Sequence, residues 1–210
     1  MPSLELLLAF AGASVIYAYV PGPAMLYASA QTIARGRRAG LMAALGIHLG
    51  GYAHVIAAAL GLSVLFEAVP LLYLAVKLSG AVYLVWLGFG MFRGSGEAGA
   101  PGAPAGERSA RRAFMQSIAV EVLNPKTAIF FLAFLPQFTD TRAAFPLWLQ
   151  LLVLGTAVNL IFTSADLVCV MMAGAITRRL RGSGLLRQWA GRLGGSVLIG
   201  LGARLALQRG

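Results

Sequence analysis

Charge is scarce in this chain of 210 residues, because 11% of the residues are charged and only 7 residues are acidic. Soluble domains carry about 25% charged residues, so the composition excludes a soluble globular domain. Hydrophobic residues replace the missing charge, making up 59% of the sequence and giving a mean hydropathy of +0.78. The composition is that of a membrane protein.

Cysteine and histidine are also rare. Cys169 is the only cysteine, which excludes an internal disulfide and a multi-cysteine metal site. His48 and His54 have a spacing that poorly matches one helical face, and no His-Glu-x-x-His pattern is present. No Gly-x-Ser-x-Gly elbow occurs either. The sequence therefore predicts no metal, no cofactor and no catalytic residues, so the protein is not expected to be an enzyme.

What the chain does contain is long apolar segments. A membrane-spanning helix takes about 20 residues, so this length accommodates about six spans with short connections. Six such segments are found, at residues 4–33, 41–66, 71–92, 113–138, 145–176 and 193–207. We predict an all-α polytopic membrane protein of about six transmembrane helices.

A single stretch resembles a linker. Residues 93–112 are rich in Gly, Ala and Pro, and we expect them to form a flexible cytosolic connection. The linker divides the chain into residues 1–92 and 113–210. Each of these parts holds three of the predicted spans.

The net charge of +10 is concentrated in particular connections. Arginines cluster after the first, third and fifth apolar segments, and cationic loops of membrane proteins face the cytosol. Both termini are therefore expected outside, on the periplasmic or extracellular face. Because the basic residues follow this topology, we attribute the charge to orientation in the bilayer and predict no nucleic-acid partner.

The two parts show signs of an inverted repeat. Residues 77–82 and 192–197 share the pattern cation-Leu-small-Gly-small-Val, and these motifs open the third and sixth spans. Proline-centred breaks occur in the first and fourth spans, at 21–23 and 124–126. Inverted repeats with interrupted helices are typical of secondary transporters whose binding site lies near the bilayer midplane.

The breaks are candidate substrate-binding segments. Proline removes a backbone donor and disfavours helix at the preceding residue, so each break should stop and restart a helix. Half-helices that begin near Ala24 and Lys126 would point free N–H groups into the protein and bind a carboxylate. The alternative is a bend that only shapes helix packing. The substrate-binding candidates are Pro21, Gly22, Pro23, Asn124, Pro125 and Lys126.

Three ionisable residues lie deep in apolar segments, where charge is costly and normally serves a pathway. Glu121 and Lys126 flank the second break and either pair with each other or share a substrate's two charges. Asp166 is a candidate to hold a substrate ammonium or to take up a proton. Its alternatives are an interhelical hydrogen bond or a position near the cytosolic surface. Glu121 and Asp166 are thus the proton-coupling or amine-binding candidates.

Further polar residues are candidates to line a cavity. His48, Tyr52 and His54 lie in the second apolar segment and Asn159 in the fifth. Gly46, Gly50 and Gly51 share the second segment with them. Small residues allow helices to approach closely, so we expect these glycines to serve packing inside the protein or a dimer interface, and a homo-oligomer stays open.

Several motifs together resemble the LysE/RhtB family of translocators, which export amino acids. The most specific is Asn124-Pro125-Lys126 followed by the Phe-rich run 130–138; the others are 21–23, 35–41, Gly46-x-x-x-Gly50 and 80–84. The resemblance covers the chain except for the linker. It implies an exporter of amino acids or close analogues in the bacterial inner membrane, driven by the proton motive force, with both breaks as its functional core.

One departure from the family bears on the substrate. Some members that handle basic amino acids carry an acidic residue in the middle of the second span, where this chain has Gly50-Gly51-Tyr52-Ala53-His54. The sequence therefore favours a neutral amino acid, apolar or hydroxylated, over lysine or arginine. The expected partners are the substrate, protons and the lipid bilayer. The alternatives are an intramembrane enzyme acting on a lipid or peptide and a passive channel for small solutes.

Overall fold

The computed structural model describes residues 3–61, 70–92, 105–140 and 142–179, and positions 192, 196, 198–200, 203–204 and 206–207. The regular secondary structure within these residues is helical, without strands, so the predicted all-α class is confirmed. Seven of the fifteen residues of the sixth predicted span, 193–207, lie outside the described residues. The arrangement of two inverted three-helix repeats therefore stays a prediction.

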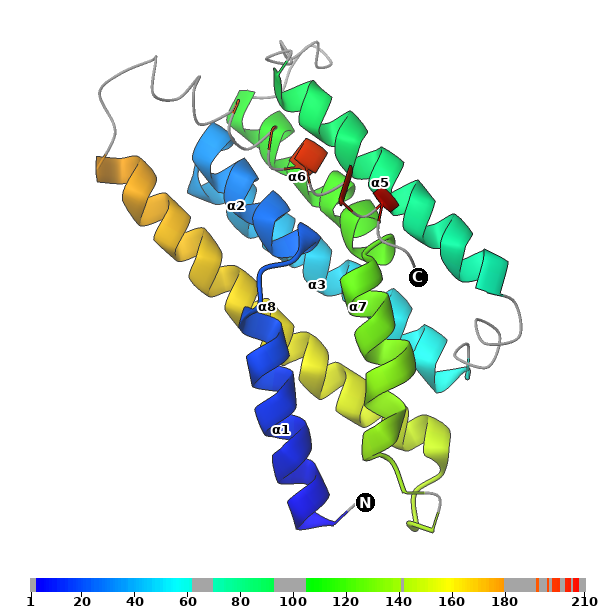
Figure 1. Ribbon diagram of the computed structural model, residues 1–210. Helices are drawn as coiled ribbons and strands as arrows, with labels where there is room; N and C mark the ends of the chain where they lie inside the picture. The colour runs from blue at the N-terminus through cyan, green and yellow to red at the C-terminus, as the bar shows by residue number, and fades with distance from the viewer. Residues whose placement is uncertain are drawn as a thin grey trace.

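The first predicted span is a bent pair of helices (Figure 1). Helix α1 covers Leu4–Tyr19, helix α2 covers Pro23–Arg35, and the bend between them is 45°. Ser3 caps α1 by accepting a hydrogen bond from the Leu6 N–H at 3.3 Å. The break falls at Pro21 and Pro23, as predicted, because proline has no backbone N–H to donate to a carbonyl of the preceding turn.

The second bent pair is the predicted fourth span. Helix α6 covers Ala105–Val122 and helix α7 covers Pro125–Ile129. The bend between Ala110–Val122 and Pro125–Phe138 is 42°. The chain continues as a π-helix, η1, over Phe130–Phe134 and a 3-10 helix, η2, over Leu135–Phe138. Both predicted proline breaks are thus confirmed.

The start of α6 corrects the predicted linker. Residues 105–112 were expected to be flexible, but they form the first turns of α6. This stretch contains Ala, Glu and Arg, which favour helix, and both prolines and four of the five glycines of the predicted linker precede it. Residues 93–104, the remainder of the predicted linker, lie outside the described residues.

Three unbroken helices complete the described fold. They are α3 over Arg37–Ala59, α5 over Pro70–Phe92 and α8 over Leu147–Arg179. Gly36, with φ of +93°, makes the sharp connection from α2 to α3, because this backbone region favours glycine. Within the described residues, two helices are long and apolar enough to cross a membrane, or four spans if each bent pair counts as one.

Glycines bring α3 against its neighbours, as predicted. A Cβ atom at Gly50 would lie 2.9 Å from the Glu121 Cβ of α6, and one at Gly46 would collide with Ser117. A Cβ atom at Gly51 would collide with the Asn159 side chain of α8. These glycines therefore pack helices within the chain, and α3 lies between α6 and α8.

Two hydrophobic clusters lie on opposite sides of the breaks. One is rich in alanine and combines α2, the amino-terminal half of α3, α5 and α6; it includes Ala28, Ala43 and Ala113. The other is aromatic and combines α1, η1 and η2 with the carboxyl-terminal end of α3 and the amino-terminal part of α8; it includes Phe10 and Phe131. The breaks therefore mark the boundary between two differently packed halves of the bundle.

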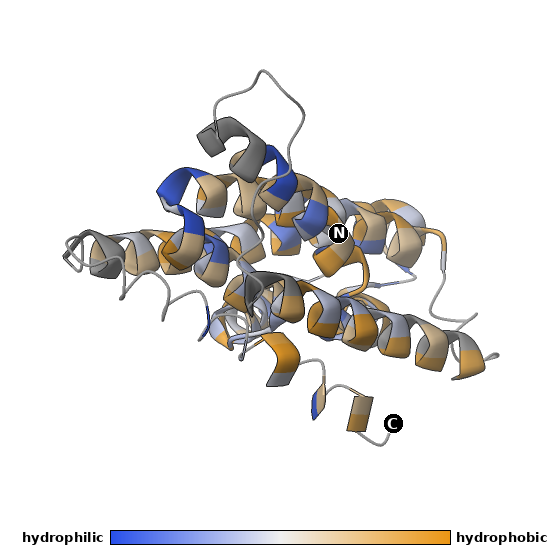
Figure 2. Cartoon of the chain, turned by 90° about the horizontal axis from the view of Figure 1, so that it is seen from above, coloured by the Kyte–Doolittle hydropathy of each residue, from blue (hydrophilic) through white to orange (hydrophobic). Residues whose placement is uncertain are grey.

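The outward faces of the helices are hydrophobic. Figure 2 shows hydrophobic residues along the helices, with hydrophilic residues restricted to short stretches. On α5, for example, Leu71, Leu78, Val82 and Trp86 are exposed. Such faces match a lipid environment, and the protein is a polytopic membrane protein.

Candidate functional site

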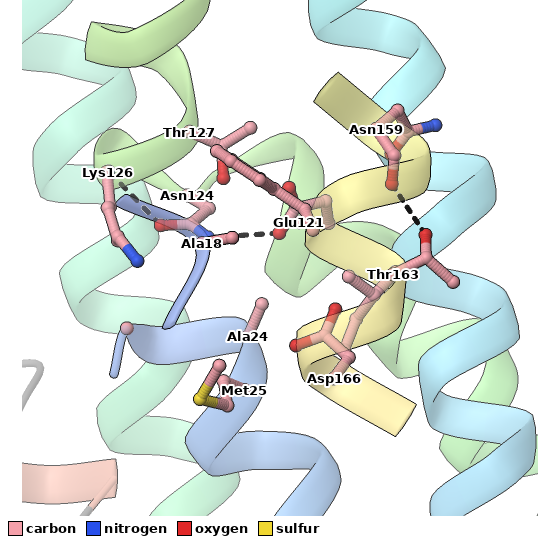
Figure 3. A pocket seen from close by; sticks show the side chains of 13 residues that line it. Ala18, Ala24, Met25, Glu121, Asn124, Lys126, Thr127, Asn159, Thr163 and Asp166 are labelled. Atoms are coloured by element: carbon pink, nitrogen blue, oxygen red, sulfur yellow. Dashed lines mark hydrogen bonds between the residues drawn. The ribbon is translucent and has the colours of Figure 1, made fainter. Parts of the chain in front are cut away.

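A cavity lies where the two breaks meet α3 and α8 (Figure 3). It leaves about 30 Å³ for the centres of water molecules, which is room for about two waters. It occurs about halfway along each participating span, the depth expected of a transporter site. The lining residues are Ala18, Gly22, Ala24, Met25, Ile47, Glu121, Asn124, Lys126, Thr127, Asn159, Phe162, Thr163 and Asp166.

The amino-terminal end of α2 is open toward this cavity. Gly22 is its N-cap residue, Pro23 begins the helix, and no side chain caps it. Gly22, Ala24 and Met25 all line the cavity. The first N–H groups of a helix lack intrahelical partners and carry partial positive charge, so this end is suited to a carboxylate.

The second break differs from the first because it caps itself. The Asn124 side-chain oxygen accepts a hydrogen bond from the Lys126 N–H at 3.1 Å. The Asn124 amide nitrogen donates in turn to a carboxylate oxygen of Glu121 at 3.0 Å. Two helix ends were predicted to bind a carboxylate. Asn124 caps the start of α7, so only the start of α2 is without a side-chain cap.

Glu121 is held on several sides. It is 3% exposed, and its carboxylate also receives a hydrogen bond from the Thr127 side chain. His54 donates from Nε2 to the backbone carbonyl of Glu121 at 2.7 Å. Because its carboxylate and its backbone carbonyl are engaged locally, Glu121 is less available to a ligand than a side chain without such partners.

Asp166 contrasts with Glu121. It is 5% exposed, and within the described residues it interacts electrostatically with Glu121 and Lys126 but accepts no hydrogen bond. In Figure 3 its carboxylate points toward the side of α2 that carries Ala24. A buried carboxylate without a donor is costly unless it binds a cation or a proton.

One hypothesis from the sequence was that Lys126 pairs with Glu121, but the two side chains form no direct ion pair. Its ammonium donates to the Tyr17 carbonyl oxygen at 3.0 Å and to that of Val20. Glu121 and Asp166 interact with it electrostatically. Lys126 therefore connects the second break to the end of α1, while its side chain lines the cavity.

A polar network from α3 and α8 forms the facing wall. The Thr163 hydroxyl donates to the Asn159 carbonyl at 2.7 Å, and Asn159 donates to the His48 carbonyl at 3.0 Å. Because the Thr163 hydroxyl proton is used in this way, His48 Nδ1 donates to Thr163 Oγ1 at 2.8 Å. The network fixes α3 against α8 beside Asp166.

The four residues predicted to line a cavity differ in their place relative to this one. Asn159 lines the cavity, but His48, Tyr52 and His54 do not. His48 is bound to Thr163, Tyr52 packs against the His48 ring at 5.3 Å between centroids, and His54 is held by Glu121. The prolines of both breaks shape the backbone without lining the cavity.

Several apolar residues of the site could not be predicted from the sequence. Met25, Ile47 and Phe162 form part of the wall, and in an apolar chain nothing in the sequence separates them from other core residues. Tyr17, which binds Lys126, is a further residue that was not predicted. It lies four residues before Pro21, which cannot donate to its carbonyl, so the sequence did indicate that this carbonyl needs another partner.

Comparison with known proteins decides the family. The model of the LysE type translocators matches residues 15–209. The chain belongs to this family. The resemblance drawn from the motifs is thus confirmed. The matched residues include both breaks and all the residues that line the cavity.

Relatives of this LysE type translocator include named efflux proteins. A leucine efflux protein of Klebsiella pneumoniae is 28% identical, with 92% of this chain and 91% of the relative covered. A threonine efflux protein of Escherichia coli strain K12 is 27% identical, with 98% and 100% covered. An uncharacterized membrane protein of Pseudomonas aeruginosa is 32% identical, with 89% and 88% covered. No solved structure matches the chain significantly.

Proposed function

We propose that this translocator exports neutral amino acids or close analogues across the bacterial inner membrane in exchange for protons. One observation carries the proposal: the cavity presents a buried carboxylate without a donor, Asp166, near an uncapped helix end, that of α2. An α-amino acid carries an ammonium and a carboxylate on one carbon. The two features provide one partner for each of these groups.

The carboxylate is assigned to the end of α2, beside Lys126. The N–H groups at this end and the lysine ammonium both favour an anion. The ammonium is assigned to Asp166. Glu121 keeps its local partners, Asn124 and Thr127, and offsets part of the positive charge of Lys126.

The substrate side chain is assigned to the apolar wall of Met25, Ile47 and Phe162. A basic side chain would need a further acidic partner, and the carboxylate of Glu121 is already engaged. The names of the leucine and threonine efflux relatives also support a neutral substrate. Since the cavity has room for about two waters, the surrounding helices must separate to admit an amino acid.

Exchange of substrate for a proton follows if the Asp166 carboxylate binds the substrate ammonium and the proton in turn. Asp166 binds the ammonium of the substrate when the site faces the cytosol and binds a proton after the substrate leaves outside. Because the two cations compete for one carboxylate, return of the empty site carries a proton inward. The orientation that we propose places both termini outside and the arginine-rich connections inside.

Reconstituted vesicles test this function. Purified protein in proteoliposomes loaded with single labelled amino acids should release neutral ones faster when the protein's outer face is acidic than when the pH is equal. Lysine and arginine should be released more slowly. The proposal fails if no amino acid of the panel leaves faster than from protein-free vesicles, or if release ignores the pH gradient.

A further inference from the structure

The ammonium of Lys126 occupies the carboxyl-terminal end of α1. It donates to the carbonyl oxygens of Tyr17 and Val20, and it lies 4.7 Å from the centre of the Tyr17 ring. Carbonyls at the end of a helix carry partial negative charge and keep acceptor capacity, and the Tyr17 carbonyl accepts the Val20 N–H at 3.3 Å as well as the ammonium. The end of α1 is therefore a cation site, and a side chain from the second break fills it.

The position of Lys126 is fixed by further contacts with the first break. The Tyr17 hydroxyl donates to the Lys126 backbone carbonyl at 2.9 Å, so the two residues exchange hydrogen bonds in both directions. A Cβ atom at Gly22 would lie 2.6 Å from the Lys126 Cδ, so the lysine side chain passes directly over the glycine. Glycine at this position lets the lysine reach α1.

In transporters with broken helices, unwound carbonyls and half-helix carboxyl ends commonly coordinate the coupling ion. Here the same type of helix end is occupied by an ammonium that belongs to the protein. An ammonium has three donors, and two of those on Lys126 are used by α1. Because Lys126 lines the cavity, its third donor is available to a substrate carboxylate at the end of α2.

We propose that Lys126 is a built-in cation that bridges the end of α1 to the substrate carboxylate, and that Tyr17 is the residue that positions it. This inference rests on the proposed amino-acid transport. It assigns to Lys126 the role that a bound sodium ion plays in other carriers. Transport should therefore not require sodium, although the helix end that would bind sodium is present.

Chemical rescue tests the bridge. Lys126→Ala removes the ammonium and leaves space for a small cation, so export of leucine or threonine, whichever the wild type exports faster, should fall at least about tenfold. Added methylammonium, a cation with three N–H donors, should restore at least about half of the lost rate. Tetramethylammonium has the same charge but no N–H donor, and it should not restore export. Wild-type export should be the same in sodium and in potassium buffers.

The Tyr17→Phe variant provides an independent test that does not rely on the folding of Lys126→Ala. It removes a hydroxyl and keeps the ring, so its half-saturation concentration should rise about two- to tenfold with a nearly unchanged maximal rate. A purely structural role would instead lower the amount of folded protein without this split. Size-exclusion chromatography of each variant reports folding.

The outcomes separate this inference from the proposed function. If the wild type exports no amino acid, the proposed function itself fails. If the wild type exports but requires sodium, the built-in cation is refuted. Folded Lys126→Ala that methylammonium does not rescue also refutes it. Should Lys126→Ala not fold, an unchanged half-saturation concentration in Tyr17→Phe refutes it.

Discussion

Two carboxylates of the cavity differ in what surrounds them. Glu121 receives hydrogen bonds from Asn124 and Thr127, whereas Asp166 faces the cavity with charges as its neighbours. Hydrogen bonds to a carboxylate stabilise its charged form, and an unpartnered buried carboxylate gains most from binding a cation. The local partners thus support the proposal that Asp166, rather than Glu121, exchanges the two cations.

Asp166→Asn should abolish proton-coupled export. The amide cannot hold a proton in exchange for an ammonium, so export driven by a pH gradient should fall at least about tenfold. Ser164→Ala is the matched control on the same helix, because Ser164 is exposed and bonded to the Ile161 carbonyl. Proteoliposome efflux with and without the gradient measures both. Gradient-driven export within twofold of wild type in Asp166→Asn would exclude Asp166 as the exchanging group.

Glu121→Gln should have a smaller effect. The glutamine side chain keeps one oxygen that accepts from Asn124, so the second break should retain its geometry. We expect export to stay coupled to the pH gradient, with a rate reduced by no more than about fivefold. The same efflux assay decides: loss of coupling in Glu121→Gln, with coupling intact in Asp166→Asn, would reverse the assignment of the two carboxylates.

Helix α3 is the element on which the others are positioned. Its glycines let α6 and α8 approach, and this approach brings Glu121 and Asn159 to the cavity. Without a strong hydrophobic driving force between helices in lipid, such close packing supplies much of the association. The glycines of α3 therefore bear on both stability and the geometry of the site.

Gly50→Ala should destabilise the protein, because the new Cβ would lie 2.9 Å from both Glu121 Cβ and the Ile118 carbonyl oxygen. Overpacking of this kind costs about 1–3 kcal/mol. Gly12→Ala is the control, since nothing lies within 4 Å of a Cβ there and alanine favours helix. Thermal unfolding in detergent should show a lower Tm for Gly50→Ala and no loss for Gly12→Ala. Equal Tm values for the two variants would contradict this prediction and show that α3 and α6 can move apart to accommodate the added methyl group.

The whole molecule brings two hydrophobic clusters together around one polar cavity. The alanine-rich cluster lies on the side of the arginine-rich connections, and the aromatic cluster lies on the side of the amino terminus. The cavity between them has room for about two waters, so the proposed carrier has no space for an amino acid in this conformation. Access from either side requires one cluster to loosen while the other stays packed, as alternating access demands.

Cysteine labelling tests the orientation of the molecule. In a Cys169→Ala background, Ser3→Cys should react with a membrane-impermeant maleimide on intact spheroplasts, because both termini are proposed to lie outside. Ser95→Cys, in the linker proposed to be cytosolic, should react only after permeabilisation. The reverse pattern would invert the topology and with it the direction assigned to transport.

Much of the element-level structure followed from the sequence alone. Hydropathy located the apolar segments, prolines located both breaks, and the motifs indicated the family. These features are local, because a proline or an apolar run acts on its own segment whatever surrounds it. The predicted linker extended too far, to residue 112, because the composition changes gradually from Gly and Pro to helix-forming residues before α6.

The tertiary structure alone decided which polar groups face one another. It capped the second break with Asn124 but left the first open, and it turned Lys126 to α1 across 109 positions of sequence. It also held His54 away from the cavity and left Asp166 facing it. These outcomes depend on how helices rotate and approach one another. Side chains from distant segments set that packing, so no local pattern encodes it.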